Sequence, residues 1–208
     1  TLARFLRVMT DPAEARDEPF ELALAELWRR TERRATAQQM QRLRASVDGY
    51  FISLVWEASH GASDVTLDEY RFMRPYTAGV PLWLMLVEIM GGHRPDAEAM
   101  VSPAMNALHE RAAHVINWEN DILSFRRESA ADPDSLNLAT VLQLTGNRDP
   151  QEALDAAAAM HAEEVVEYQR AEAVVLRDAL PSVDAYVHSL RIVISGFHAW
   201  FVASGRYG

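Results

Sequence analysis

The stretch NDILSFRRE, residues 120–128, combines polar side chains with the apolar spacing of a helix. Side chains four positions apart share one face of a helix, so Asn120, Ser124 and Glu128 are expected to project their oxygen atoms together. An amide carbonyl, a hydroxyl and a carboxylate suit a hard cation such as Mg²⁺, which usually shares its ligands with substrate phosphates. The same spacing fits solvent-facing residues at the end of an ordinary amphipathic helix, so the stretch alone leaves both interpretations open.

Helical spacing of apolar residues continues through almost all of the chain, with Pro, Gly and Asp between the segments. No segment shows the sustained alternation of a strand, so the sequence predicts an all-α fold. The expected helices cover about 19–35, 36–60, a short segment after Thr66, 80–90, 101 or 103 to 127, 135–145, 150–179 and 182–203. No repeat or linker divides the chain, so we expect a single domain over residues 1–208.

Composition excludes several classes of function. The formal net charge of −10 disfavours a nucleic-acid partner, because the surface would repel a phosphate backbone. The absence of cysteine excludes disulfides and thiol nucleophiles and is compatible with the cytoplasm. The longest apolar run, residues 80–90, contains Glu88 and is far shorter than the ~20 residues of a membrane helix. We therefore expect a buried core helix there and no membrane insertion.

Other catalytic patterns are weak. No G-x-S-x-G elbow suggests a serine hydrolase. The five-residue spacing of His109 and His114 places them on different helical faces, which disfavours zinc. The three carboxylates Glu163, Glu164 and Glu167 are expected to be solvated on a polar helix face.

Two further stretches contain groups suited to phosphate. The segment YRFMRPYTAG, residues 70–79, places Arg74 before Pro75, which removes a backbone donor and predicts that a helix breaks there. Gly79 is expected to contribute to the same break, before the helix over residues 80–90. A plain kinked surface helix is the alternative. The chain ends in GRYG, where a guanidinium fork and a phenol at Arg206 and Tyr207 could hold phosphate oxygens.

Residues 120–128 resemble the NSE motif of bacterial class I terpene synthases at every motif position. The resemblance implies that Asn120, Ser124 and Glu128 ligate one magnesium ion. It further implies that Asp121 plays a supporting role by pairing with a neighbouring base and that Arg127 faces diphosphate.

The segment around Arg74 resembles the family's diphosphate sensor and helix break, and it precedes Asn120 by the family's usual 46 residues. The resemblance implies Arg74 as the sensor, Thr77 as the linker, and Ala78, with Gly79, as the effector that triggers ionisation.

The terminal pair resembles the family's Arg-Tyr pair, which implies that Arg206 and Tyr207 bind the leaving diphosphate. With weaker likenesses at WEAS (56–59), NLATVL (137–142) and residues 183–196, the resemblance covers nearly the whole chain.

The family resemblance implies a helical bundle around an apolar cavity. It implies a lyase that ionises a linear prenyl diphosphate with three magnesium ions and cyclises the allylic cation. Farnesyl diphosphate is the expected substrate, with geranyl or geranylgeranyl diphosphate as alternatives, and a homodimer is possible. Ring faces could stabilise carbocations in the cavity, although core packing is the default for the candidate aromatic residues: Phe51, Trp56, Trp83, Trp118, Phe197 and Trp200.

The aspartate-rich motif of the family does not occur in this sequence. Asp11, Asp17 and Glu18 flank Pro12 and Pro19 in an expected loop and cannot share a helical face. We therefore expect amino-terminal helices with that motif to precede residue 1, and these 208 residues alone to be inactive. The alternative is a helical module that only binds diphosphate; a prenyl elongase is disfavoured because elongases lack the NSE pattern.

Overall fold

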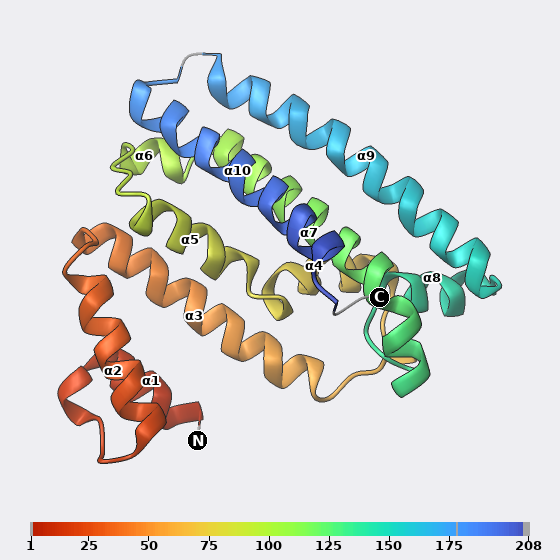
Figure 1. Cartoon of the computed structure of the whole chain (residues 1–208), viewed down its shortest axis with the longest axis horizontal. Coiled ribbons are helices and arrows are strands. Elements are labelled where there is room, and N and C mark those ends of the chain that lie inside the picture. The colour runs from red at the N-terminus through yellow and green to blue at the C-terminus, as the bar shows by residue number, and fades with distance from the viewer. Residues whose placement is uncertain (1, 178, 206–208) are drawn as a thin grey trace.

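The computed structural model describes residues 2–177 and 179–205, and within these ranges the chain forms helices and no strand (Figure 1). The predicted all-α fold is confirmed. Ten α-helices and two 3₁₀ turns follow one another in the described residues: α1 (Leu2–Thr10), η1 (Pro12–Glu14), α2 (Pro19–Glu32), α3 (Ala37–Glu57), η2 (Ala62–Asp64), α4 (Leu67–Thr77), α5 (Val80–Met90), α6 (Ala97–Met100), α7 (Pro103–Ala131), α8 (Leu138–Gly146), α9 (Pro150–Leu176) and α10 (Pro181–Ala203).

Helix starts follow the capping residues of the sequence. Thr36, Thr66 and Asp149 each accept a hydrogen bond from the backbone N–H three residues later, in a capping box that starts α3, α4 and α9. Helix ends agree less well, because they carry weaker signals: α7 continues to Ala131, beyond the expected end at residue 127.

The expected break at Pro75 is wrong. Pro75 lies inside α4, which continues to Thr77 and has Ala78 as its carboxyl-terminal cap. The interruption falls at Gly79, whose φ of 68° and ψ of 21° lie in the left-handed region, and α5 begins at the next residue. Glycine adopts this conformation without the steric cost that a Cβ would add.

The long helix α7 lies in the middle of the bundle and contributes to two buried clusters. One packs Leu108 of α7 with Tyr186 and Leu190 of α10, and the other packs Trp118 with Tyr70 of α4. Helix α9 lies alongside α7 (Figure 1). These contacts fix α7, so its polar face is presented from a rigid element.

The apolar helix α5 meets the expectation of a buried core helix only in part: one of its faces is buried, but Trp83 is 50% exposed. Glu88, on the buried face, is 1% exposed. Its carboxylate accepts hydrogen bonds from Arg42 Nη2 at 2.5 Å and Gln39 Nε2 at 2.8 Å, both from α3. Paired in this way, the charge is tolerated in the core. Across the described ranges, no helix is long and apolar enough to cross a membrane.

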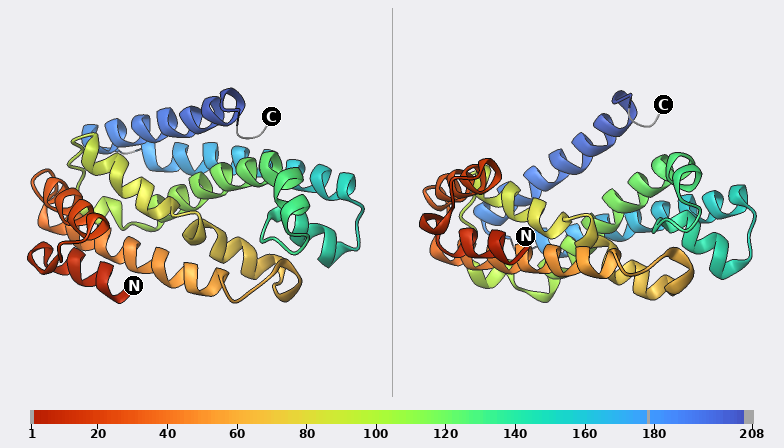
Figure 2. Two further views of the ribbon diagram at one scale, coloured as in Figure 1. Left: turned by 60° about the horizontal axis from the view of Figure 1, so that its bottom comes forward. Right: turned by 90° about the horizontal axis from the view of Figure 1, so that it is seen from below.

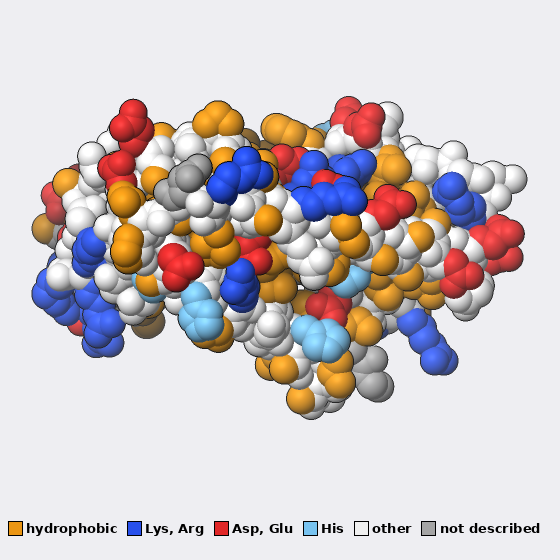
Figure 3. Space-filling model, turned by 90° about the horizontal axis from the view of Figure 1, so that it is seen from above, with side chains coloured by type: hydrophobic (Ala, Val, Ile, Leu, Met, Phe, Trp, Pro, Cys, Tyr) orange, Lys and Arg blue, Asp and Glu red, His pale blue; other side chains and the backbone are white. Residues whose placement is uncertain are grey.

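The carboxyl-terminal half of α10 diverges from the other helices, as Figure 2 shows in its right-hand view. Several of its apolar side chains are accordingly exposed, including Ile192, Trp200 and Val202. On the face shown in Figure 3, acidic, basic and hydrophobic side chains are interspersed, so this face presents no uniformly charged patch.

Candidate metal and diphosphate site

A cavity of about 600 Å³ lies where the ends of α3, α4 and α7 meet. Arg74 of α4, Glu57 of α3 and Glu128 of α7 contribute to its wall, together with the loop from Asp132 to Leu136. Most of this lining is polar, as a site for a charged ligand requires. A separate cavity of about 540 Å³ is bordered by residues of α3, α4, α5 and α7 and has a largely apolar lining.

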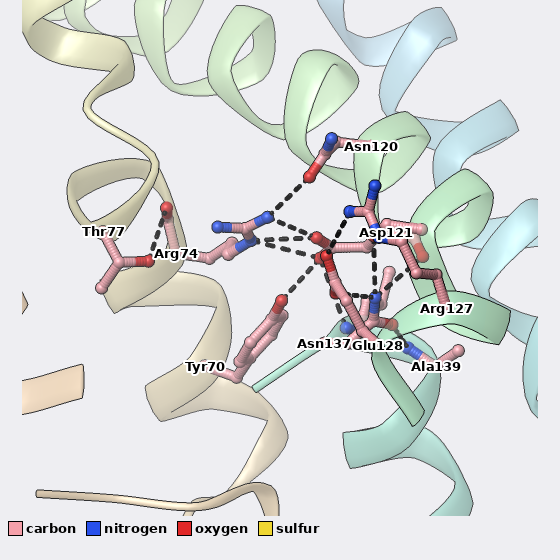
Figure 4. Close-up of polar contacts among 11 residues, drawn as sticks. Tyr70, Arg74, Thr77, Asn120, Asp121, Arg127, Glu128, Asn137 and Ala139 are labelled. Carbon is pink, nitrogen blue, oxygen red and sulfur yellow. Dashed lines mark hydrogen bonds and ion pairs between the residues drawn. The ribbon is translucent and has the colours of Figure 1, made fainter. Parts of the chain in front are cut away.

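The guanidinium of Arg74 joins α4 to the polar face of α7 (Figure 4). Its Nη2 donates to Asn120 Oδ1 at 3.0 Å and to Asp121 Oδ1 at 2.5 Å, and its Nε donates to Asp121 Oδ1 at 3.0 Å. Burial lowers the pKa of Arg74, but the charge and hydrogen bond of Asp121, together with Tyr70 and Glu128, outweigh burial and raise it. The cation therefore persists at every accessible pH.

Asp121 is fully buried and surrounded by donors. Besides Arg74, Tyr70 Oη donates to its Oδ2 at 2.5 Å and the Leu138 N–H donates at 3.3 Å. Burial is the largest influence on the pKa of Asp121 and raises it overall, although Arg74 and Tyr70 act in the opposite direction. Because all of these neighbours donate, the site is complementary to the ionised carboxylate.

The side-chain amide of Asn137 lies among the oxygens of the α7 motif. Its Nδ2 is 2.8 Å from the Asp121 carbonyl, 3.0 Å from Glu128 Oε2 and 3.4 Å from Ser124 Oγ. Asn137 is fully buried and also caps α8, because its Oδ1 accepts from the Ala139 N–H at 2.9 Å. The sequence showed the segment NLATVL, but nothing in it singled out Asn137 as a site residue.

Glu57 is a second site residue that the sequence interpretation missed. Burial raises the pKa of its carboxyl group, Arg74 lowers it, and Glu128 raises it. The carboxyl group of Glu57 therefore interacts electrostatically with Arg74 of α4 and with Glu128 of α7. The WEAS segment was noted, but a single glutamate near a helix end carries no spacing signal.

The oxygens of the α7 motif fit a divalent cation chemically. An amide oxygen, a hydroxyl and a carboxylate lie successively at Asn120, Ser124 and Glu128, all hard ligands. Ser124 is fully buried, and the Asn137 amide touches the oxygens of Ser124 and Glu128, as partners of metal ligands commonly do. Among the residues that the structure describes, no group of three or more His, Asp or Glu side chains forms an alternative metal site.

Residues proposed from the sequence to trigger ionisation lie directly beyond Arg74. Thr77 Oγ1 donates to the Arg74 carbonyl at 3.3 Å, and Ala78 has a partly exposed side chain at the end of α4. Gly79 is buried beside the ring of Tyr50. Arg127 is exposed, and its Nη2 lies 3.4 Å from Glu128 Oε1. Arg206 and Tyr207 lie outside the described residues.

The six candidate aromatic residues separate into different environments. Trp118 is fully buried in the core and stacks on His114. Trp83 and Trp200 are about half exposed, and Trp83 meets Phe197 edge to face at 6.0 Å. Phe51 packs partly buried against a cluster that includes Met9, Trp28 and Met85. None of the six lines either of the two cavities described above.

One glutamate of α9 contradicts the expectation of solvation. Glu164 is 5% exposed and accepts from Arg71 and Arg111, with His114 Nδ1 at 3.3 Å. Burial raises its pKa, but hydrogen bonds and charges from His114 and Arg111 outweigh burial and lower the pKa to about 2. The helical pattern could not reveal its partners, which come from α4 and α7.

Comparison with known proteins gives a consistent result. Residues 1–167 match the family described as terpene synthase family 2, C-terminal metal binding. The chain is 29% identical over 198 residues to 4-epi-cubebol synthase ((2E,6E)-farnesyl diphosphate cyclizing) of Streptosporangium roseum, covering 92% of this chain and 58% of that protein. It is 30% identical over 191 residues to (12E)-labda-8(17),12,14-triene synthase of Streptomyces anulatus, and this match covers 90% of this chain and 59% of that protein.

The solved structure of a-eudesmol synthase superposes with a TM-score of 0.84 at 26% identity, over 98% of this chain and 70% of that one. The chain therefore has the helical fold of the terpene synthases. It spans less than two thirds of the length of the two relatives described above.

Proposed function

Because this chain belongs to terpene synthase family 2, C-terminal metal binding, we propose that it supplies the metal- and diphosphate-binding part of a class I terpene synthase. The proposed reaction is loss of diphosphate from a linear prenyl diphosphate, followed by cyclisation of the allylic cation. The observation that carries this proposal is the contact of Arg74 with Asn120 and Asp121 beside a polar cavity. A buried guanidinium and metal-ligating oxygens at one point suit a ligand with both diphosphate and cation.

We propose that Asn120, Ser124 and Glu128 hold one Mg²⁺, with three ions in the complete enzyme. When bound, Mg²⁺ stabilises the negative charge that develops on the leaving diphosphate. The chain's own contribution is to orient the ligand oxygens. Asn137 does this by donating toward Ser124 and Glu128, which restricts their side-chain rotation.

Arg74 is the proposed diphosphate sensor, and Asp121 holds its guanidinium ready. A guanidinium can exchange a carboxylate for phosphate oxygens without losing its charge, because both ligands accept its planar fork of donors. Arg127, Arg206 and Tyr207 are proposed to add further donors to diphosphate.

The break between α4 and α5 is the proposed trigger. Thr77, Ala78 and Gly79 connect Arg74 to α5, so a movement of Arg74 toward diphosphate is transmitted directly to the Ala78 carbonyl and the Gly79 turn. We propose that the carbonyl dipole then faces the developing cation. Exposed Trp83 and Trp200, with Phe197, are the proposed aromatic wall near α10.

Farnesyl diphosphate is the proposed substrate, since sesquiterpene synthases are common in this bacterial family. The 4-epi-cubebol synthase relative, which cyclises (2E,6E)-farnesyl diphosphate, supports this choice, whereas the labdatriene synthase indicates that other products occur among relatives. Geranyl and geranylgeranyl diphosphate are the alternatives. Homodimerisation and a cytoplasmic location stay predictions.

Product analysis by gas chromatography and mass spectrometry tests the proposal. The full-length gene product is incubated with Mg²⁺ and geranyl, farnesyl or geranylgeranyl diphosphate, beside the Asn120→Ala variant. A cyclic hydrocarbon or alcohol that disappears in the variant supports a terpene synthase and identifies its substrate. No product from any of the three, with Mg²⁺–diphosphate binding retained, favours the inactive binding module.

A further inference from the structure

Pro75 leaves one carbonyl of α4 without its helical partner. In an α-helix the N–H of residue 75 would donate to the Arg71 carbonyl, but proline has no N–H. His114 Nε2 of α7 lies 3.3 Å from this same oxygen. A carbonyl only accepts, so in this contact the imidazole Nε2 carries a proton and donates.

His114 is itself held firmly. It is 3% exposed and its ring stacks on Trp118 at 4.6 Å with 10° between the planes. Its second nitrogen, Nδ1, lies 3.3 Å from Glu164 Oε1 of α9. Glu164 Oε1 also accepts from Arg71 Nη2 at 3.2 Å, so the carboxylate contacts the same turn of α4. The imidazole therefore connects the proline turn to two other helices.

From this geometry we propose that His114 is a positioning residue for Arg74. Arg71 and Arg74 belong to the same turn of α4, and a helix that lacks a hydrogen bond at proline is free to bend there. By supplying the missing donor, His114 holds this turn of α4 in place and with it the direction in which Arg74 reaches Asn120 and Asp121. The inference rests on the proposed function, since it assigns His114 a role in presenting the diphosphate sensor.

Two substitutions separate the contacts of the imidazole. The amide nitrogen of glutamine in His114→Gln reaches the place of Nε2, and that of asparagine in His114→Asn reaches the place of Nδ1. His114→Gln therefore keeps the donor to the Arg71 carbonyl, and His114→Asn loses it. Both variants remove the ring and its stacking on Trp118, so each controls for that loss in the other.

The first measurement is the binding of inorganic diphosphate with Mg²⁺ to each variant by calorimetry. We expect His114→Asn to weaken binding roughly fivefold or more, the equivalent of one lost hydrogen bond, and His114→Gln to stay near wild type. Adding Pro75→Ala restores a backbone N–H for Arg71, so it should recover most of the affinity in the His114→Asn background. Equal affinities for His114→Asn and His114→Gln would overturn the proposal.

The second measurement is the NMR resonance of the Arg74 Nε–H, which reports the contact with Asp121 directly. Its chemical shift should change in His114→Asn and stay at the wild-type value in His114→Gln. Adding Pro75→Ala to His114→Asn should return it toward the wild-type value. If wild type binds no diphosphate but these shifts occur, the proposed function fails while the positioning role stands. An unmoved Arg74 resonance in His114→Asn refutes the positioning role whatever the binding result.

Discussion

Arg74 Nη2 lies 2.5 Å from Asp121 Oδ1, and this ion pair joins two helices inside the protein. The Arg74 side chain is 12% exposed and that of Asp121 is 1% exposed, so water screens neither charge effectively. The pair therefore contributes to the stability of the fold, and in the proposed reaction it holds the guanidinium of Arg74 in place for diphosphate.

Asp121→Asn should lower the free energy of unfolding by about 3 kcal/mol, because it leaves the buried Arg74 cation without its counter-charge. Urea denaturation measures this change. The double variant Arg74→Met with Asp121→Asn should be more stable than Asp121→Asn alone, since no unpaired charge then remains. If the free energy of unfolding of Asp121→Asn lies within ~0.5 kcal/mol of the wild-type value, water already solvates the ion pair.

Asn137→Ala should weaken the binding of Mg²⁺–diphosphate roughly tenfold, because its amide orients oxygens of the proposed ligands Ser124 and Glu128. Calorimetric titration of Mg²⁺ in the presence of inorganic diphosphate measures the effect. Asn106→Ala is the matched control, because Asn106 is exposed at the other end of α7. Equal affinities for the two variants would remove Asn137 from the site.

Sequence periodicity was sufficient for the fold because almost every helix carries both an apolar stripe and a capping residue at its start. The capping boxes at Thr36 and Thr66 fixed where α3 and α4 begin. The break at Pro75 was misplaced because proline costs a helix one hydrogen bond but does not forbid continuation when a tertiary partner replaces it. That partner, His114, lies on α7, 43 positions beyond Arg71 along the chain.

Part of the candidate site followed from spacing, since Asn120, Ser124 and Glu128 lie on one helix and their common face depends only on helical geometry. Asn137 and Glu57 did not, because their place beside this face depends on how the loops return to α7 and α4. Likewise, Glu164 is buried and paired because basic residues of neighbouring helices, Arg71 and Arg111, donate to it, and its own helix gives no sign of them. Residues that act through tertiary contacts leave no periodic signal in a single sequence.

Gly79→Ala should lower the free energy of unfolding by about 1–2 kcal/mol, the cost of a Cβ in the left-handed region. Gly196→Ala is the matched control: it lies in α10 with open space at its Cβ position, and should be neutral or stabilising by up to ~1 kcal/mol. Thermal or urea unfolding distinguishes them. If both variants are stabilised, the chain does not turn through a left-handed residue at position 79.

The stabilising effect of Glu164 should depend on pH in a defined range. Its pKa is about 2 in the folded protein against 4.5 for a free glutamate, so folding favours the ionised form. The contribution is therefore complete above pH 4.5 and is lost as the pH falls toward 2. Glu164→Gln removes the group that titrates.

Urea unfolding of wild type and Glu164→Gln between pH 5.5 and pH 3 gives the test. The stability difference should stay constant down to about pH 4.5 and then shrink, because protonation removes from wild type what the variant already lacks. Glu163→Gln is the neighbouring control: Glu163 is exposed on the same helix, so this variant should follow wild type throughout. A gap between wild type and Glu164→Gln that is as wide at pH 3 as at pH 5.5 would mean that shape, and not charge, explains the contribution of Glu164.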